Sequence, residues 1–147
     1  MRDPYRVLVW GPGGLGSIAI WEALELPELE LVGVRCYSDA KVGLDAGHAV
    51  GRGANGVLMS DDVDALLAIE ADAVLYFALD MGTFHTDDEV LRILESGKNV
   101  ITPLPYQQAH LVRDGAFLAR LDQACAAGES TFHATGIDPD AVSERVV

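Results

Sequence analysis

The strongest constraint on the fold of this chain is a glycine motif that directly follows an apolar run near the N-terminus. Residues 5–10 read Tyr-Arg-Val-Leu-Val-Trp, and Gly11-Pro-Gly-Gly-Leu-Gly16 comes next. A short apolar run that ends in glycines predicts a buried parallel strand, and residues 14–26 follow with the pattern of a helix. Glycines spaced G-x-G-x-x-G between a strand and a helix are typical of dinucleotide-binding sites.

Each glycine of the motif has its own expected role. We expect Gly11 to permit a tight turn, Gly13 to let the backbone approach a pyrophosphate, and Gly16 to let the helix pack against the strand. The first N–H groups of the helix and the positive end of its dipole would face the phosphates. The predicted cofactor-binding loop is therefore Gly11, Pro12, Gly13, Gly14, Leu15 and Gly16. The alternative is a tight turn that binds no ligand.

The end of the second predicted strand distinguishes NAD from NADP. NAD enzymes carry an acidic residue about 20 positions past the glycines, and Cys36 occupies that position here. The nearest carboxylate, Asp39, comes later and in a predicted loop. Arg35, Ser38 and Lys41 would instead surround a 2′-phosphate, so the sequence favours NADP, with NAD as the second choice. In the alternative interpretation, Arg35 and Lys41 are solvated loop charges.

The rest of the chain alternates between strand-like and helix-like segments. Further strands are predicted at residues 29–36, 56–59, 73–79, 98–102 and 130–135, and further helices at 61–70, 87–97 and 115–127, with a helical turn at 45–50. This alternation predicts an α/β fold with a doubly wound, mostly parallel, six-stranded sheet of the Rossmann type. At 147 residues, the chain is expected to form one domain, residues 1–147.

An acidic cluster precedes the helix predicted at 61–70. Ser60 or Asp61 is expected to cap this helix, and Asp61, Asp62 and Asp64 fall in its first turn. Because carboxylates are stabilised at the positive end of a helix dipole, the cluster is explained without a metal ion, and we expect no metal site. Gly128 is expected to end the helix at 115–127.

Four further polar side chains fall near predicted strand ends. His85 and His133 are candidate general acids, although a hydrogen-bonded structural role is favoured for each. Asp80 and Asp138 are expected on the crevice side, and turn formation is the favoured interpretation of both. The sequence identifies no catalytic residue.

Composition excludes several classes of partner. The net charge of −13 argues against nucleic acid and against anionic membrane surfaces. Cys36 and Cys125 lack C-x-x-C spacing, so we expect reduced thiols in a cytoplasmic protein. The sequence shows no signal peptide and no apolar stretch long enough to span a bilayer.

Four segments together resemble the N-terminal cofactor domain of dihydrodipicolinate reductases. They are V-L-V-W-G-P-G-G-L-G-S at 7–17, K-V-G-L-D-A-G-H-A-V-G at 41–51, E-S-G-K-N-V-I-T at 95–102 and H-A-T-G-I-D-P-D at 133–140. They are more similar still to the dihydrodipicolinate reductase-like amino-acid dehydrogenases, such as 2,4-diaminopentanoate dehydrogenase. The glycine loop occurs in many dinucleotide-binding proteins, whereas G-x-D-A-G-x-x-x-G at 43–51 and T-G-I-x-P at 135–139 are more specific to this family.

The resemblance implies NAD(P)-dependent hydride transfer to or from a C=N or C=C group of a small amino-acid-derived substrate. It also implies that the loops after the first, fourth and fifth strands lie along the cofactor. Carried over to this chain, the cofactor neighbours beyond the glycine loop would be Ala78, Leu79, Thr102 and Pro103. The resemblance further implies a homo-oligomer for the full-length protein.

The sequence departs from the family at three points. The His-His-x-x-K substrate motif of the reductases is absent, and Asp140 stands where the dehydrogenases often have glycine. The C-terminal substrate and dimerisation domain does not follow. We therefore expect the NAD(P)-binding domain only, without a full active site. The alternative is a free-standing, non-catalytic NADP(H)-binding or sensing module, and a third interpretation is binding of another nucleotide such as coenzyme A.

Overall fold

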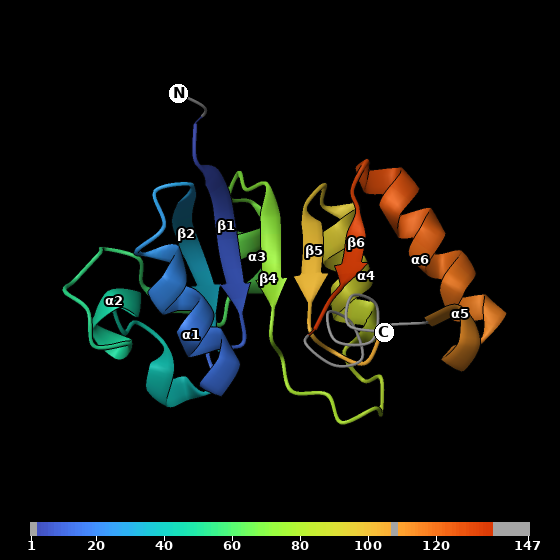
Figure 1. The fold of residues 1–147 in the computed structure, drawn as a ribbon, viewed down its shortest axis with the longest axis horizontal. Coiled ribbons are helices and arrows are strands. Elements are labelled where there is room, and N and C mark those ends of the chain that lie inside the picture. The colour runs from blue at the N-terminus through green and yellow to red at the C-terminus, as the bar shows by residue number, and fades with distance from the viewer. Residues whose placement is uncertain (1–2, 107–108, 137–147) are drawn as a thin grey trace, which may run out of the picture. The chain divides into compact units, whose positions relative to one another are not determined.

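The computed structural model describes residues 3–106 and 109–136 (Figure 1). The chain divides into two compact units, Met1–Ala78 and Leu79–Val147.

The first unit contains four parallel strands and the helices that connect them. Its elements are β1 (Tyr5–Trp10), α1 (Gly14–Ala23), β2 (Leu29–Arg35), the 3₁₀ turn η1 (Asp39–Lys41), α2 (Ala46–Ala49), β3 (Met59–Ser60), α3 (Val63–Leu67) and β4 (Ala73–Tyr76). The strands are ordered β3-β2-β1-β4, and every pair is parallel. Strand β1 is therefore central, which explains its continuous apolar sequence.

Strand β1 buries side chains on both faces of the sheet. Val7 and Val9 pack with Ile20 of α1 in one core cluster. Leu8 points to the opposite face, where it lies near Leu66 of α3. Figure 1 shows α1 in front of the strands and α3 behind them. Helices thus cover both faces of this part of the sheet, as the doubly wound prediction requires.

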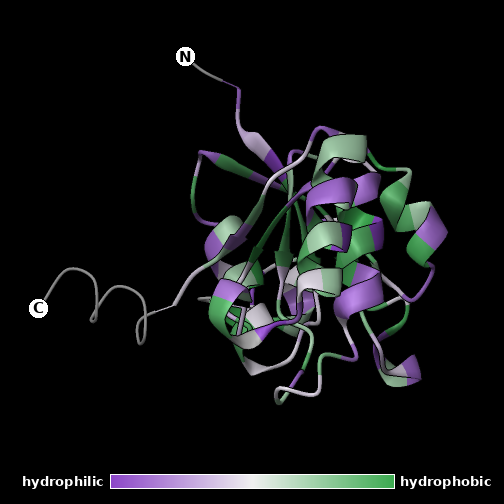
Figure 2. Cartoon of the chain, turned by 90° about the vertical axis from the view of Figure 1, so that its right-hand side faces the viewer, coloured by the Kyte–Doolittle hydropathy of each residue, from purple (hydrophilic) through white to green (hydrophobic). Residues whose placement is uncertain are grey.

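The second unit contains two parallel strands and three helices. Its elements are α4 (Asp87–Glu95), β5 (Asn99–Thr102), α5 (Ala109–Val112), α6 (Gly115–Gly128) and β6 (Phe132–Ala134), with β5 paired to β6. The predicted apolar face of α4, which includes Val90, Leu91 and Leu94, is buried. Figure 2 shows hydrophobic and hydrophilic stretches along the helices, as expected where one face of a helix is covered. The six strands and their helices form the predicted Rossmann-like α/β fold.

Helices α4 and α6 come into close contact at Gly128. A Cβ atom at Gly128 would lie 1.9 Å from the carbonyl oxygen of Leu94. The sequence predicted that Gly128 ends the helix, but α6 includes Gly128, and Glu129 adopts the left-handed cap conformation with φ of 51°. Gly128 is therefore required by close packing and not by a positive φ.

Several predicted boundaries differ from the structure by a few residues. Helix α1 ends at Ala23 and not at 26, strand β3 is Met59–Ser60 and not 56–59, and strand β4 ends at Tyr76 and not at 79. Asp62 caps α3 by accepting a hydrogen bond from the Ala65 N–H at 2.9 Å. The cap predicted at Ser60 or Asp61 is therefore wrong. Ser60 instead accepts a hydrogen bond from the Asp62 N–H, and so positions the true cap.

Candidate functional site

The first glycine of the motif turns the chain beside the end of β4. Gly11 has φ of +85°, and a Cβ atom there would lie 2.8 Å from the backbone nitrogen of Ala78. Both the positive φ and the close approach exclude other residues. The tight turn predicted at Gly11 is confirmed, and the structure brings Gly11 and Ala78 together.

The other two glycines of the motif differ in what surrounds them. A Cβ atom at Gly16 would lie 2.1 Å from the Gly11 carbonyl oxygen, so α1 packs directly on the turn. Nothing lies within 4 Å of a Cβ atom built at Gly13 or Gly14, and both residues are exposed together with Leu15. The close packing predicted for Gly16 is confirmed, and the space beside Gly13 is open.

The N-terminus of α1 presents backbone donors that lack a cap. Gly13 occupies the N-cap position and has no side chain, and the first turn carries no acidic residue. Within residues 3–106 and 109–136, no hydrogen bond is found for the N–H groups of Gly14, Leu15 and Gly16. Because such groups carry the positive end of the helix dipole, they are suited to an anion.

Lys41 lies against the glycine loop. Its Nζ donates a hydrogen bond of 2.5 Å to the carbonyl oxygen of Pro12, the residue between the first two glycines. Lys41 reaches this position from η1, where its own N–H bonds the Ser38 carbonyl. The interpretation of Lys41 as a freely solvated charge is therefore wrong.

Arg35 ends β2 and contacts the glycine loop through its backbone. Its carbonyl accepts a hydrogen bond of 2.9 Å from the Gly11 N–H. Its guanidinium lies over the Tyr37 ring, 4.4 Å from the ring centroid. The Nε and Nη1 atoms are buried without a hydrogen-bond partner in the part of the chain that the structure describes. Ser38 is exposed at the N-cap of η1.

Trp10 is a second buried donor near Arg35 that the sequence did not single out. Its side chain is fully buried, and its indole Nε1 has no hydrogen-bond partner among the described residues. In the sheet register Trp10 lies opposite Arg35 on one side and Tyr76 on the other. Unpartnered donors on adjacent strands are unusual, because a buried polar group without a partner costs about 1–3 kcal/mol.

The glycine-rich loop after η1 is organised by one carboxylate. Asp45 caps α2 and accepts hydrogen bonds from the N–H groups of His48, Asn55 and Gly56 at 2.9–3.2 Å. These hydrogen bonds lower the pKa of Asp45. The G-x-D-A-G-x-x-x-G motif at 43–51 therefore has a structural role, because its aspartate holds the two ends of the loop together.

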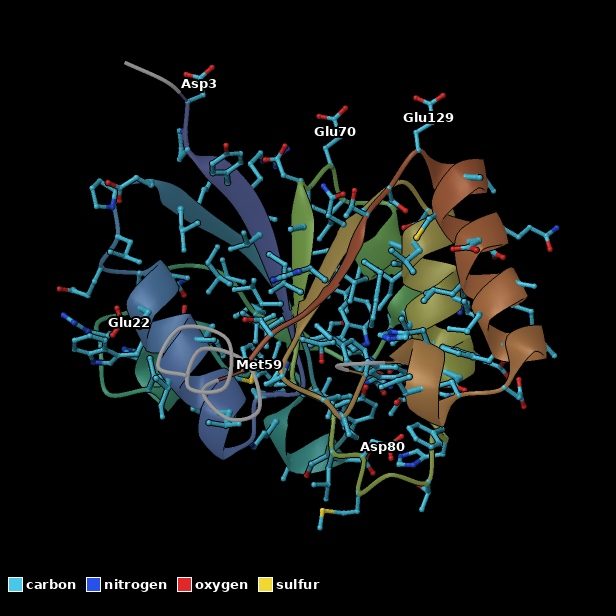
Figure 3. The ribbon with its side chains drawn as sticks, turned by 45° about the vertical axis from the view of Figure 1, so that its right-hand side comes forward. Asp3, Glu22, Met59, Glu70, Asp80 and Glu129 are labelled. Atoms are coloured by element: carbon cyan, nitrogen blue, oxygen red, sulfur yellow. The ribbon has the colours of Figure 1, made fainter. Side chains whose placement is uncertain are left out.

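A rigid turn follows β4 and is built around Asp80 (Figure 3). Asp80 Oδ1 accepts hydrogen bonds from the N–H groups of Gly82, Thr83 and Phe84 at 2.8–3.0 Å, and Oδ2 accepts one from the Thr86 hydroxyl at 3.0 Å. Burial raises the pKa of Asp80, but these hydrogen bonds outweigh it and lower the pKa to about 2. Asp80 is thus a turn-forming carboxylate, as predicted.

His85 and His133 have different surroundings. His85 Nδ1 lies 2.8 Å from the Thr83 hydroxyl and 3.5 Å from Asp80 Oδ2, and its side chain is 63% exposed. The hydrogen-bonded position expected for His85 is therefore observed. His133 is exposed on β6. Asp138 and the end of the T-G-I-x-P segment lie outside the described residues, as does Asp140.

The sequence missed a buried cation in the second unit. Arg113 pairs with Asp87 through two hydrogen bonds and is sandwiched between Phe84 and Phe117, 3.7 and 3.6 Å from the ring centroids. Tyr106 also donates to Asp87 at 2.6 Å. The sequence shows only that residues 84–117 contain cations, anions and several aromatic residues. It does not indicate which of them contact one another.

The residues after β4 and β5 that are predicted to contact the cofactor differ in their exposure to solvent. Leu79 is 77% exposed, whereas Thr102 is fully buried. The Thr102 hydroxyl accepts a hydrogen bond from the Leu104 N–H at 3.1 Å, and Pro103, between them, is half-buried. The side chain of Thr102 therefore stabilises the turn after β5 and is not presented to solvent.

Comparison with known proteins adds two sequence relatives. No protein-family model matches the chain. It is 33% identical over 138 residues to an amine dehydrogenase from Streptomyces virginiae, covering 90% of this chain and 38% of that protein. It is 38% identical over 89 residues to a 4-hydroxy-tetrahydrodipicolinate reductase from Paraburkholderia phymatum, covering 59% of this chain and 33% of that protein.

Solved structures share the fold. The amine dehydrogenase from Mycobacterium smegmatis is 28% identical, with a TM-score of 0.79 over 90% of this chain and 39% of that one. Biliverdin reductase from Synechocystis, solved with biliverdin and NADP⁺, has a TM-score of 0.68 at 19% identity over 97% of this chain and 43% of that one. GenD2 from gentamicin A biosynthesis, solved with NAD, has a TM-score of 0.67 at 18% identity over 91% and 35%.

These similarities agree with a glycine loop suited to a nucleotide. The chain spans less than two fifths of the length of the two curated relatives it matches, and both are named as a dehydrogenase or a reductase. Their names support the resemblance to the nucleotide-binding region of nicotinamide-dependent oxidoreductases, and the neighbours include both an NAD and an NADP complex. Among the described helices, none combines the length and apolar character that a bilayer crossing requires.

Proposed function

We propose that this chain is the cofactor-binding domain of an NAD(P)-dependent oxidoreductase. One observation carries the proposal: the glycine loop leaves open space at Gly13, directly before an uncapped helix N-terminus. Gly11 and Gly16 are needed to form the turn, but among the described residues nothing lies within 4 Å of a Cβ atom built at Gly13. At the second position of a G-x-G-x-x-G motif, open space leaves room for a pyrophosphate to approach the backbone.

The residues of the first unit fit a dinucleotide. The N–H groups of Gly14, Leu15 and Gly16 would donate to the pyrophosphate, as helix N-termini do in this class of site. At the end of β2, Arg35 would hold a 2′-phosphate close to the Ser38 hydroxyl, which favours NADP over NAD. When bound, the nicotinamide supplies or accepts the hydride, and the protein's part is to orient it and exclude water.

The finer assignments rest on the family resemblance. We propose a small amino-acid-derived substrate with a C=N or C=C group, and the amine dehydrogenase relatives support a nitrogen-bearing one. Affinity to the 2,4-diaminopentanoate dehydrogenase-like members stays a prediction. So do a C-terminal substrate domain, a homo-oligomer and cofactor contacts from Ala78, Leu79, Thr102 and Pro103.

Cofactor binding by calorimetry tests this function directly. We expect the chain to bind NADPH more tightly than NADH, and Gly13→Val to abolish binding of both while leaving the circular-dichroism spectrum unchanged. Gly53→Val is a matched control, because Gly53 also has open space around its Cβ position but lies outside the glycine loop. Unaltered binding in Gly13→Val would remove the loop from the site.

A further inference from the structure

We propose that Lys41 acts on the part of the cofactor that NAD and NADP share, and that Arg35 alone distinguishes the two. This inference rests on the proposed function. It gives separate binding roles to Arg35 and Lys41, which the sequence alone assigns to one 2′-phosphate site. The structure gives these two cations different positions and different partners.

Lys41 belongs to the glycine loop. Its ammonium donates to the carbonyl oxygen of Pro12, and Pro12 is buried next to Gly13, the glycine predicted to approach the pyrophosphate. The Ser17 hydroxyl also lies 3.5 Å from that carbonyl oxygen. Lys41 is therefore fixed at the loop itself, and not at the end of β2.

The contact with Pro12 has an electrostatic consequence for any anion at the loop. A carbonyl oxygen carries partial negative charge and repels a phosphate that approaches it. An ammonium held against that oxygen offsets the repulsion and adds a positive charge close to the amide donors of α1. This effect acts on the pyrophosphate, which both dinucleotides carry.

Arg35 lies at the position where dinucleotide-binding folds contact the adenosine ribose. It ends β2, where dinucleotide-binding folds recognise the 2′-hydroxyl or the 2′-phosphate. Its Nε and Nη1 atoms are buried without a partner among the described residues, and no described carboxylate forms an ion pair with it. A guanidinium without a carboxylate partner is suited to a phosphate, because its planar fork matches phosphate oxygens.

Two matched substitutions separate these roles. Lys41→Met and Arg35→Met each replace a cation with an unbranched apolar side chain of similar length. Isothermal titration calorimetry would measure the dissociation constants of NADP⁺, NAD⁺, 2′,5′-ADP and ADP for each variant. Of the two fragments, ADP has the pyrophosphate without a 2′-phosphate, and 2′,5′-ADP has the 2′-phosphate without a pyrophosphate.

We expect Lys41→Met to weaken NADP⁺, NAD⁺ and ADP by a similar factor of about ten, because it removes one positive charge close to the pyrophosphate. We expect Arg35→Met to weaken NADP⁺ and 2′,5′-ADP by about tenfold or more and to leave NAD⁺ and ADP within twofold. Lys41→Gln and Arg35→Gln replace either variant that fails to fold by circular dichroism.

The inference is overturned if Lys41→Met leaves NAD⁺ and ADP unchanged, whether or not NADP⁺ weakens. It is also overturned if Arg35→Met weakens NAD⁺ as much as NADP⁺. Failure of the proposed function has a different signature, because the unsubstituted chain would then bind none of the four nucleotides.

Discussion

Gly16 and Gly11 lie so close together that a methyl group on Gly16 would sit 2.1 Å from the carbonyl oxygen of Gly11. The first turn of α1 therefore rests on the backbone of the preceding turn. Neither partner has a flexible side chain that could move aside. The distance makes the glycine loop a rigid unit, set before any ligand arrives.

Gly16→Ala is expected to destabilise the protein by about 3 kcal/mol, because the clash is with backbone and the helix must shift to relieve it. Gly14→Ala, with nothing within 4 Å of its Cβ position, is the matched control and should change the free energy of unfolding by less than about 1 kcal/mol. Urea denaturation of both variants measures the difference. Equal stabilities would show that α1 does not pack on Gly11 as described.

Asp80 predicts an acid-dependent contribution to stability. Its pKa falls from 3.8 to about 2 on folding, so its stabilisation is complete above pH 4 and is lost as the pH falls from about 4 to about 2. The loss corresponds to about 2 kcal/mol, since the carboxylate is 1% exposed and little screened. Denaturation of the parent chain and of Asp80→Asn across this pH range measures it.

The two stability curves should converge toward pH 2. Asp88→Asn, which removes an 84% exposed carboxylate from the same part of the chain, is the control for the loss of one negative charge. A constant gap between the parent and Asp80→Asn from pH 5 to pH 2 would contradict the lowered pKa.

Arg113→Met should destabilise the second unit by about 3 kcal/mol. The substitution leaves the half-buried Asp87 carboxylate without its cation and removes the guanidinium from between two rings. Arg120→Met is the control, because Arg120 pairs with Asp88 at a side-chain exposure of 56% and should therefore be much less destabilising. Thermal unfolding compares them, and similar melting temperatures for both variants would rule out the buried pair as a stabilising contact.

Asp45→Ala should open the loop at 45–57 without unfolding the sheet. Asp45 holds the N–H groups of three loop residues, and Arg52 lies within this loop as a tryptic site. We expect cleavage after Arg52 to accelerate by about tenfold or more in Asp45→Ala, because proteolysis follows local opening. Asp39→Ala, which removes an exposed carboxylate from η1, should leave the rate unchanged. Mass spectrometry of the fragments identifies the site, and equal rates would mean that Asp45 does not close the loop.

The fold was predictable because its signals are local. The apolar run before Gly11 predicts a buried strand, and the alternation of segments predicts the parallel sheet. The roles of Gly11 and Gly16 followed from the spacing of the motif. Predicted boundaries were less accurate where several acceptable caps are adjacent: Ser60, Asp61 and Asp62 are all good capping residues, and Asp62 is the one that caps α3.

The site was harder to predict because its contacts join residues far apart in the sequence. Nothing local indicates that Lys41 bonds the carbonyl of Pro12, or that Arg113 inserts between Phe84 and Phe117. The sequence correctly placed Gly128 near the end of a helix, but it attributed the glycine to helix termination. The glycine is required because Leu94 on another helix lies close to it. Contacts of this kind depend on how helices are placed, and periodicity does not encode that placement.

The burial of Trp10 gives the protein an internal optical reporter. Trp10 is fully enclosed and immediately precedes Gly11, whereas Trp21, the other tryptophan, is 40% exposed beneath the Arg52 guanidinium. Light emitted by Trp10 should therefore be shifted to the blue and shielded from acrylamide, and Trp21→Phe would leave it as the sole tryptophan emitter. Events at the glycine loop could then be followed by fluorescence, without attaching a dye.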